Sequence, residues 1–158
     1  MNNNYHDNFE IPPYQLDQFQ DLITKLFQCC QERIQYQSDR FDLPDAELRC
    51  LKQFDQERYL TAKGIARRMN VVKSRVTKII DGLTRKDYVQ RVKDPGDSRV
   101  TLLSLTPKGT AKLNEINGFL EEVHREVLSR MPESERTAVL SNLELLKAAM
   151  RSVKDMMV

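Results

Sequence analysis

The sequence predicts a mainly α fold with one small β-hairpin, which places it in the α+β class. The chain has 158 residues, close to the size of one ordinary domain, and contains only five glycines and six prolines. Its apolar residues recur at helical spacing along most of its length, whereas alternation replaces that spacing between residues 88 and 105. A chain of this length buries enough surface to fold without a metal ion or a disulfide.

Six helices follow from the apolar periodicity and from the residues that start and stop helices. Thr61 is a suitable N-cap, Asn70 and Val71 suit a turn, and Thr106-Pro107 combines an N-cap residue with proline at the first helical position. Pro44 and Pro132 also lie where first helical turns would begin. The predicted helices are 15–38, 44–54, 62–69, 72–86, 107–130 and 132 onward.

A β-hairpin is predicted between the fourth and fifth helices. Residues 88–92 alternate between apolar and polar types, and residues 100–105 do so again. Between them lies Lys93-Asp94-Pro95-Gly96-Asp97-Ser98, whose Pro-Gly pair is typical of a turn. The helical pattern is therefore interrupted once, by two short strands.

The net charge of +2 conceals a strong segregation of charge along the chain. Residues 61–110 hold twelve Lys and Arg residues against four Asp residues, a balance of +8, so the rest of the chain carries −6. Such a basic segment is the electrostatic footprint of a protein that binds a phosphate backbone. The usual alternative explanation is that the charged residues lie on solvated helix faces. This explanation does not account for the separation of positive and negative charge into different segments of the chain.

The fourth helix indicates which polyanion is bound. At 100° per residue, its apolar sector comprises Val72, Val76, Ile79, Ile80 and Leu83. The opposite face carries hydroxyl and charged groups, namely Ser74, Thr77, Lys78 and Asp81, flanked by Lys73 and Arg75. Hydroxyls bond to base edges or phosphates, and a threonine methyl can touch a thymine methyl. A recognition helix presents its N-terminal residues to the DNA major groove in this way.

At this point the chain resembles the MarR family of winged helix-turn-helix regulators over residues 15–150. The most specific stretch is residues 94–109, DPGDSRVTLLSLTPKG, which matches the family's wing: a D-x-R turn, an alternating strand, then L-T-x-x-G opening a helix. Leu60-Thr61 and Lys73-Ser74-Arg75-Val76-Thr77 support the match. The resemblance implies an N-terminal extension (1–14), dimerisation helices (15–43 and 107–158) and a DNA-binding module (44–106).

The resemblance also implies roles for individual residues. Arg99 would enter the minor groove, and Asp97 would be a structural partner of a nearby arginine. Ser98 departs from the Arg or Lys often found there, which predicts a weaker grip, with Lys93 as a compensating contact. The complete set of expected DNA-binding residues is Lys73, Ser74, Arg75, Thr77, Lys78, Lys93 and Arg99.

The expected partners are a second copy of the chain, a pseudo-palindromic duplex operator and a small effector. A dimer has support outside the family, because the terminal helices carry more apolar stripe than one small module can cover. The resemblance implies a repressor that responds to phenolic or aromatic molecules, or to oxidants. Cys29, Cys30 and Cys50 are candidates for a redox response, although free cysteines often serve only as small core residues.

Two other classes of function stay open on the sequence alone: a winged module that binds protein instead of DNA, and an enzyme acting on a small anion. The enzyme has little support, since the glycines are scattered and His6 and His124 lack metal-ligand spacing. No cofactor or metal is expected. No apolar run exceeds three residues, the N-terminus lacks a signal pattern and the cysteine count is odd, so a cytoplasmic location is expected.

Overall fold

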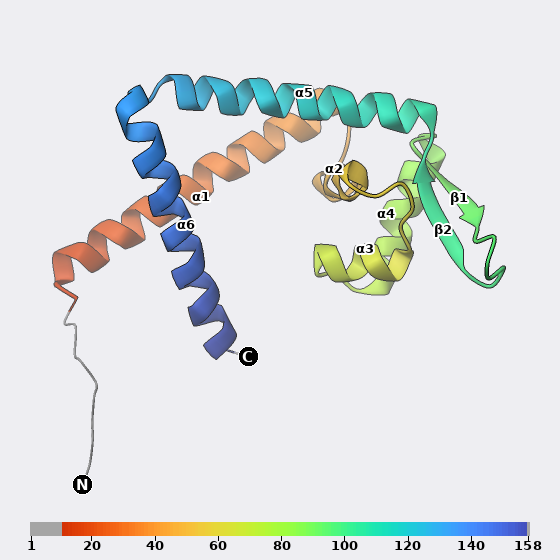
Figure 1. Ribbon diagram of the computed structural model, residues 1–158, viewed down its shortest axis with the longest axis horizontal. Coiled ribbons are helices and arrows are strands. Elements are labelled where there is room, and N and C mark those ends of the chain that lie inside the picture. Colours follow the sequence, from red (N-terminus) through yellow and green to blue (C-terminus); the bar gives the residue numbers. More distant parts are fainter. Residues whose placement is uncertain (1–10, 158) are drawn as a thin grey trace, which may run out of the picture. The chain divides into compact units, whose positions relative to one another are not determined.

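The structure is a computed structural model that describes residues 11–157, and its chain is divided into two compact units between Thr106 and Pro107. The first unit contains α1 (Pro13–Phe41), α2 (Asp45–Leu51), the 3₁₀ helix η1 (Lys52–Asp55), α3 (Ala62–Met69), α4 (Lys73–Arg85), β1 (Val89–Lys93) and β2 (Thr101–Leu105) (Figure 1). The second unit contains α5 (Pro107–Ser129) and α6 (Glu133–Met156). The mainly helical fold with one hairpin is therefore confirmed.

The largest differences from the predicted boundaries lie before α3; after it, helix ends move by one residue, and Pro132 is the N-cap of α6 and not part of its first turn. Helix α1 is longer than expected at both ends, and residues 13 and 14 of the predicted extension already belong to it. Residues 1–10 of that extension lie outside the described residues. Pro44 is the N-cap of α2 and not part of its first turn, and the expected helix to residue 54 tightens into η1 after Leu51. Tightening to 3₁₀ geometry is common in a last turn.

Helix α3 and the turn after it form as the sequence predicts. The Thr61 side chain accepts a hydrogen bond from the Gly64 backbone N–H at 3.0 Å, which satisfies one otherwise unpaired donor of the first turn. Asn70 ends the helix in the left-handed conformation (φ 53°), which asparagine tolerates better than most residues. Helix α4 begins three residues later, so α3 and α4 form a helix-turn-helix.

One apolar core holds α2, α3, α4 and the hairpin together. Its fully buried side chains are Leu43, Cys50, Leu51, Ile65, Val76, Leu83 and Val89. At the edge of this core, Glu47 of α2 forms an ion pair with Lys86 at 2.7 Å. The Glu47 carboxylate lies so close to Gly82 that a Cβ atom there would collide with it. The absence of a Cβ atom at Gly82 therefore leaves room for the Glu47 carboxylate, whose ion pair with Lys86 links α2 to the end of α4.

The hairpin is antiparallel, with Val89 opposite Leu105 and Lys93 opposite Thr101. A third segment also forms backbone hydrogen bonds to the hairpin, and the sequence pattern does not predict it. Leu60 forms a single bridge to Leu103, with N···O distances of 3.0 and 2.7 Å in the two directions. Because α3 begins two residues after Leu60, this bridge fixes the hairpin to the helix-turn-helix.

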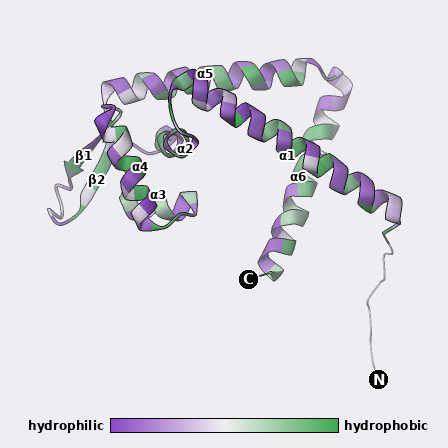
Figure 2. Ribbon diagram, turned by 180° about the vertical axis from the view of Figure 1, so that it is seen from behind, coloured by the Kyte–Doolittle hydropathy of each residue, from purple (hydrophilic) through white to green (hydrophobic). Residues whose placement is uncertain are grey.

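Helices α1 and α6 expose regular apolar stripes in the isolated chain. Figure 2 shows hydrophobic residues interleaved with hydrophilic ones along both helices. On α1 the exposed apolar residues include Leu16, Phe19, Leu22, Leu26, Phe27 and Ile34, and on α6 they include Leu140, Leu143, Met150 and Val153. No residue of α6 is buried. Within residues 11–157, no helix is both long enough and apolar enough to cross a membrane.

Candidate nucleic-acid interface

Helix α4 separates its residues into a buried and an exposed face. Val76, Ile79, Ile80 and Leu83 are buried as predicted, and the exposed residues include Lys73, Ser74, Arg75, Thr77 and Lys78. Val72 contradicts the prediction, because it is 69% exposed. It is the N-cap of α4 and has an extended backbone (ψ 150°), so a helical projection does not give the direction of its side chain.

The hydroxyl group of Thr77 is partly used within the helix. Its Oγ1 donates a hydrogen bond to the Lys73 carbonyl oxygen at 3.1 Å, one turn earlier. Toward a ligand, this side chain therefore offers its methyl group and an acceptor. Ser74, by contrast, lies exposed on the first turn of the same helix.

Many cations of the basic segment are exposed and form no ion pair within residues 11–157. They lie on α3, along α4 and on β1: Lys63, Arg67, Lys73, Arg75, Lys78, Arg85 and Lys93. Three other cations of the segment are held by acidic partners and have structural roles instead. Arg68 pairs with Glu57, Lys86 with Glu47, and Arg91 with Asp81 at 2.7 Å. In the folded chain, the positive charge of residues 61–110 therefore forms a surface on which these cations have no compensating ion pair within the described residues.

The tip of the hairpin is organised by its two aspartates. Asp94 accepts from the Gly96 N–H at 2.7 Å, and Asp97 accepts from the backbone N–H of Arg99 at 3.0 Å. The Arg99 guanidinium donates to both carboxylate oxygens of Asp97, at 3.0 and 3.2 Å. This hydrogen bonding lowers the pKa of Asp97 and raises the pKa of Arg99. The Arg99 side chain is nevertheless 89% exposed, so it projects from the tip with its charge intact.

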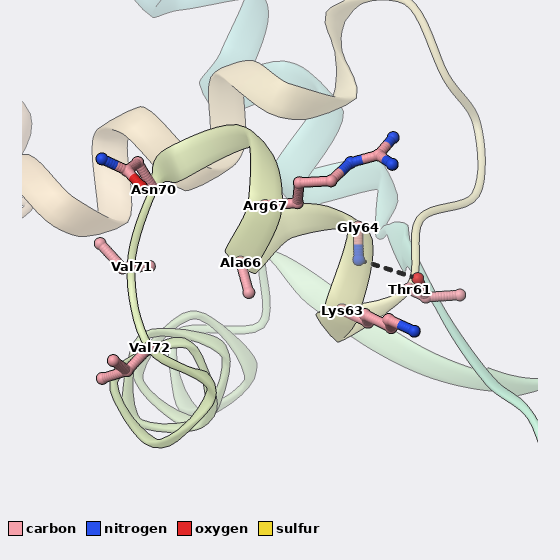
Figure 3. A pocket seen from close by; sticks show the side chains of 8 residues that line it. All are labelled: Thr61, Lys63, Gly64, Ala66, Arg67, Asn70, Val71 and Val72. Atoms are coloured by element: carbon pink, nitrogen blue, oxygen red, sulfur yellow. Dashed lines mark hydrogen bonds between the residues drawn. The ribbon is translucent and has the colours of Figure 1, made fainter. Parts of the chain in front are cut away.

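A hollow of about 750 Å³ lies between α3 and the start of α4. In Figure 3, Val71 and Val72 line one side of it, Ala66 lies in the middle, and Lys63 and Thr61 line the other side. Arg67 also lines the hollow. Lys63 and Arg67 are functional candidates that the sequence reasoning counted as basic residues without assigning them to the site. Lys63 and Arg67 are four residues apart and follow the capping Thr61, so both lie on one face of α3. This spacing in the sequence could have identified them as site residues.

The three cysteines differ in exposure: Cys29 and Cys30 are exposed on α1, whereas Cys50 is buried. Burial, with a smaller contribution from the negative charge of Glu47, raises the pKa of Cys50 from 9.0 to about 12. Within the described residues there is no cluster of three or more His, Cys, Asp or Glu side chains that could hold a metal ion.

We expect Cys50 to be inert toward thiol reagents in the native protein. A pKa moved from 9.0 to about 12 lowers the thiolate fraction at pH 8 about a thousandfold, before shielding by the core is counted. In a Cys30→Ala variant, intact-mass measurement after iodoacetamide treatment at pH 8 should show one rapid modification at Cys29. Modification of the second thiol, Cys50, should occur only in denaturant. Rapid native modification of Cys50 would contradict the burial of this thiol.

Comparison with known proteins places this surface in a family. The model of the MarR family matches residues 43–101, which run from the loop before α2 into β2. The HTH-type transcriptional repressor MdtR of Bacillus subtilis (strain 168) is 30% identical over 113 residues, covering 72% of this chain and 73% of that protein. Sequence similarity thus extends beyond the helix-turn-helix and the wing.

Solved structures agree with this placement. The YusO protein from Bacillus subtilis is 26% identical, with a TM-score of 0.73 over 89% of this chain and 99% of that one. FabT of Streptococcus pneumoniae, solved in complex with DNA, has a TM-score of 0.75 at 22% identity, over 87% of this chain and 99% of that one. The arrangement of helices and hairpin described above is therefore a winged helix-turn-helix.

Proposed function

Because the chain belongs to the MarR family of transcriptional regulators, we propose that it binds a pseudo-palindromic DNA operator as a two-fold dimer and represses a nearby operon. Members of this family are regulators and not enzymes, which removes the enzyme alternative raised by the sequence. The relative MdtR is described as a repressor, and that description supports the sign of regulation proposed here.

One observation carries the proposal: exposed, ionically unpartnered cations surround the outer face of α4. In this assignment, Ser74 and Thr77 of α4 face base edges in the major groove, and Lys73, Arg75 and Lys78 contact the phosphates that border it. Lys93 and Arg99 of the wing contact the flanking backbone and minor groove. The helix-turn-helix supplies a rigid support for these side chains, since α4 is fixed by the core and by the Glu47–Lys86 ion pair. Asp97 holds the wing tip in shape and makes no DNA contact itself.

The apolar stripes of α1 and α6 support the dimer. Monomeric proteins rarely expose contiguous apolar patches of this kind, and a second copy of the chain is the partner that a two-fold operator requires. Two copies would place their recognition helices about 34–36 Å apart, one turn of duplex DNA.

We further propose that a small phenolic or aromatic molecule, or an oxidant, modulates DNA affinity in the cytoplasm. The effector class comes from the family, and exposed Cys29 and Cys30 are the thiols through which an oxidant would act. An effector would shift the equilibrium between arrangements of the two DNA-binding modules. Unchanged operator affinity after quantitative thiol oxidation would exclude the redox form of this regulation.

The central test is a mobility-shift titration with DNA from upstream of the protein's own gene and with duplexes selected from a randomised pool. We expect selection of an inverted repeat, and a decrease in log K with log[salt] of about 0.9 for each phosphate neutralised. A protein-interaction module would bind no duplex preferentially. A flat salt dependence would show that the basic surface makes no phosphate contacts.

Arg99→Ala is expected to weaken binding to all duplexes by a similar factor and to reduce the salt slope by about one per half-site, because the wing loses one cationic contact. Arg125→Ala on α5 is the matched control, since it removes an exposed arginine outside the basic segment. A change in the selected sequence, with an unchanged salt slope, would instead assign Arg99 to base recognition.

A further inference from the structure

Val72 is an exposed apolar side chain on an otherwise charged surface. It is 69% exposed, directly before the cationic first turn of α4. Its carbonyl oxygen accepts hydrogen bonds from the backbone N–H groups of Arg75 at 3.1 Å and Val76 at 3.2 Å. The position of Val72 is therefore fixed by the helix, although its side chain packs little against the protein.

The surroundings of Val72 indicate which partner would cover it. The hollow that it borders is lined across from it by Lys63, with Arg67 also in its wall, and Lys73 and Arg75 follow in the chain (Figure 3). All four cations are exposed and form no ion pair within the described residues. An apolar protein partner would leave these charges without compensation. A DNA strand brings phosphates for the cations together with one apolar group at the base edge, the 5-methyl group of thymine.

We propose that Val72 packs against a thymine methyl group in the major groove and is a specificity-determining residue of this protein. This inference rests on the proposed function and adds a base identity to it. A valine side chain has no hydrogen-bonding atoms, so it distinguishes base pairs only by apolar contact. The methyl group is the feature by which thymine differs from uracil. Removing it should therefore remove the contact without changing any Watson–Crick pair.

The experiment combines protein and DNA variants. Fluorescein-labelled duplexes selected from a randomised pool are resynthesised with each thymine replaced, one position per half-site at a time, by deoxyuridine. Affinities are measured for the full-length chain, for Val72→Ala, which loses both γ-methyl groups, and for Val72→Thr, which keeps one. Because Val72 is exposed, Val72→Ala should melt like the parent protein, whereas Val72→Thr supplies a hydroxyl at the N-cap of α4 and should melt at the same temperature or higher. Thermal unfolding checks both.

With the parent chain, replacement of thymine by uracil at one position should weaken binding about fourfold per half-site, which is the effect of one buried methyl group. Replacement at the other thymine positions should have a smaller effect. The penalty should vanish with Val72→Ala and persist in part with Val72→Thr. If DNA binds but no uracil substitution couples to residue 72, or if Val72→Ala weakens all duplexes equally, the proposal is wrong and the proposed function stands. If no duplex is selected at all, both fail.

Discussion

Replacing Lys73, Arg75 and Lys78 together by glutamine is expected to lower operator affinity on the order of a thousandfold. The variant loses three cationic contacts per half-site and six per dimer, and an exposed charge contact contributes about 0.7 kcal/mol, within the usual range for exposed pairs. Six such contacts amount to about 4 kcal/mol, which is roughly a factor of a thousand. The salt slope should fall by about 2.7 per half-site.

The fold should tolerate this triple change. All three side chains are exposed, and none forms an ion pair within the described part of the chain, so the melting temperature should stay close to that of the parent. A control with Lys25, Arg125 and Arg130 changed to glutamine removes the same total charge from α1, from α5 and from the turn after α5. An equal loss of affinity in the control would mean that net charge, and not the face of α4, determines binding.

Leu140→Glu combined with Leu143→Glu should convert the protein to a monomer. Both side chains are about half exposed on the apolar stripe of α6, so the isolated chain tolerates the change. In a two-fold interface each substitution counts twice, and burying the exposed half of a leucine contributes about 0.75–1.5 kcal/mol. Dimer affinity should therefore fall by at least about two orders of magnitude. Operator affinity should fall with it, because a monomer binds only one half-site at a time.

Sedimentation equilibrium measures this outcome directly. Leu145→Glu is the matched control: it introduces the same charge on the same helix at a position that is 71% exposed and lies off the stripe. The control should stay dimeric and keep its operator affinity. A double variant that stays dimeric, or a control that dissociates, would show that another face of the chain forms the dimer.

The fold was largely predictable because most elements are local. The periodicity of α4, the Thr61 cap and the Pro-Gly turn of the wing are each encoded within a few residues. The Leu60–Leu103 bridge was not predictable, since a single-residue pairing has no period. The position of Val72 was misjudged for a related reason: helical projection applies only to residues with helical backbone, and a cap residue lies outside that rule.

The candidate site was only partly predictable. Sequence reasoning selects the cations of α4 and the wing, but it does not distinguish cations that are held by an acidic partner from those that are not. Lys86 and Lys63 have equal charge in the sequence, yet Lys86 is paired with Glu47 of α2, while Lys63 lines the hollow. That distinction depends on tertiary contacts between residues about forty positions apart.

The bridge between Leu60 and Leu103 determines where the gene can tolerate inserted codons. Residues 56–59 are exposed and precede the bridge, so extra residues there would lengthen a surface loop and leave the wing in place. One extra residue at 61 would move the start of α3 away from the bridge between Leu60 and Leu103. The wing would then no longer be held at a fixed position relative to the helix-turn-helix. Hydrogen exchange should show the same link, with the Leu60 and Leu103 amides opening together as one cooperative unit.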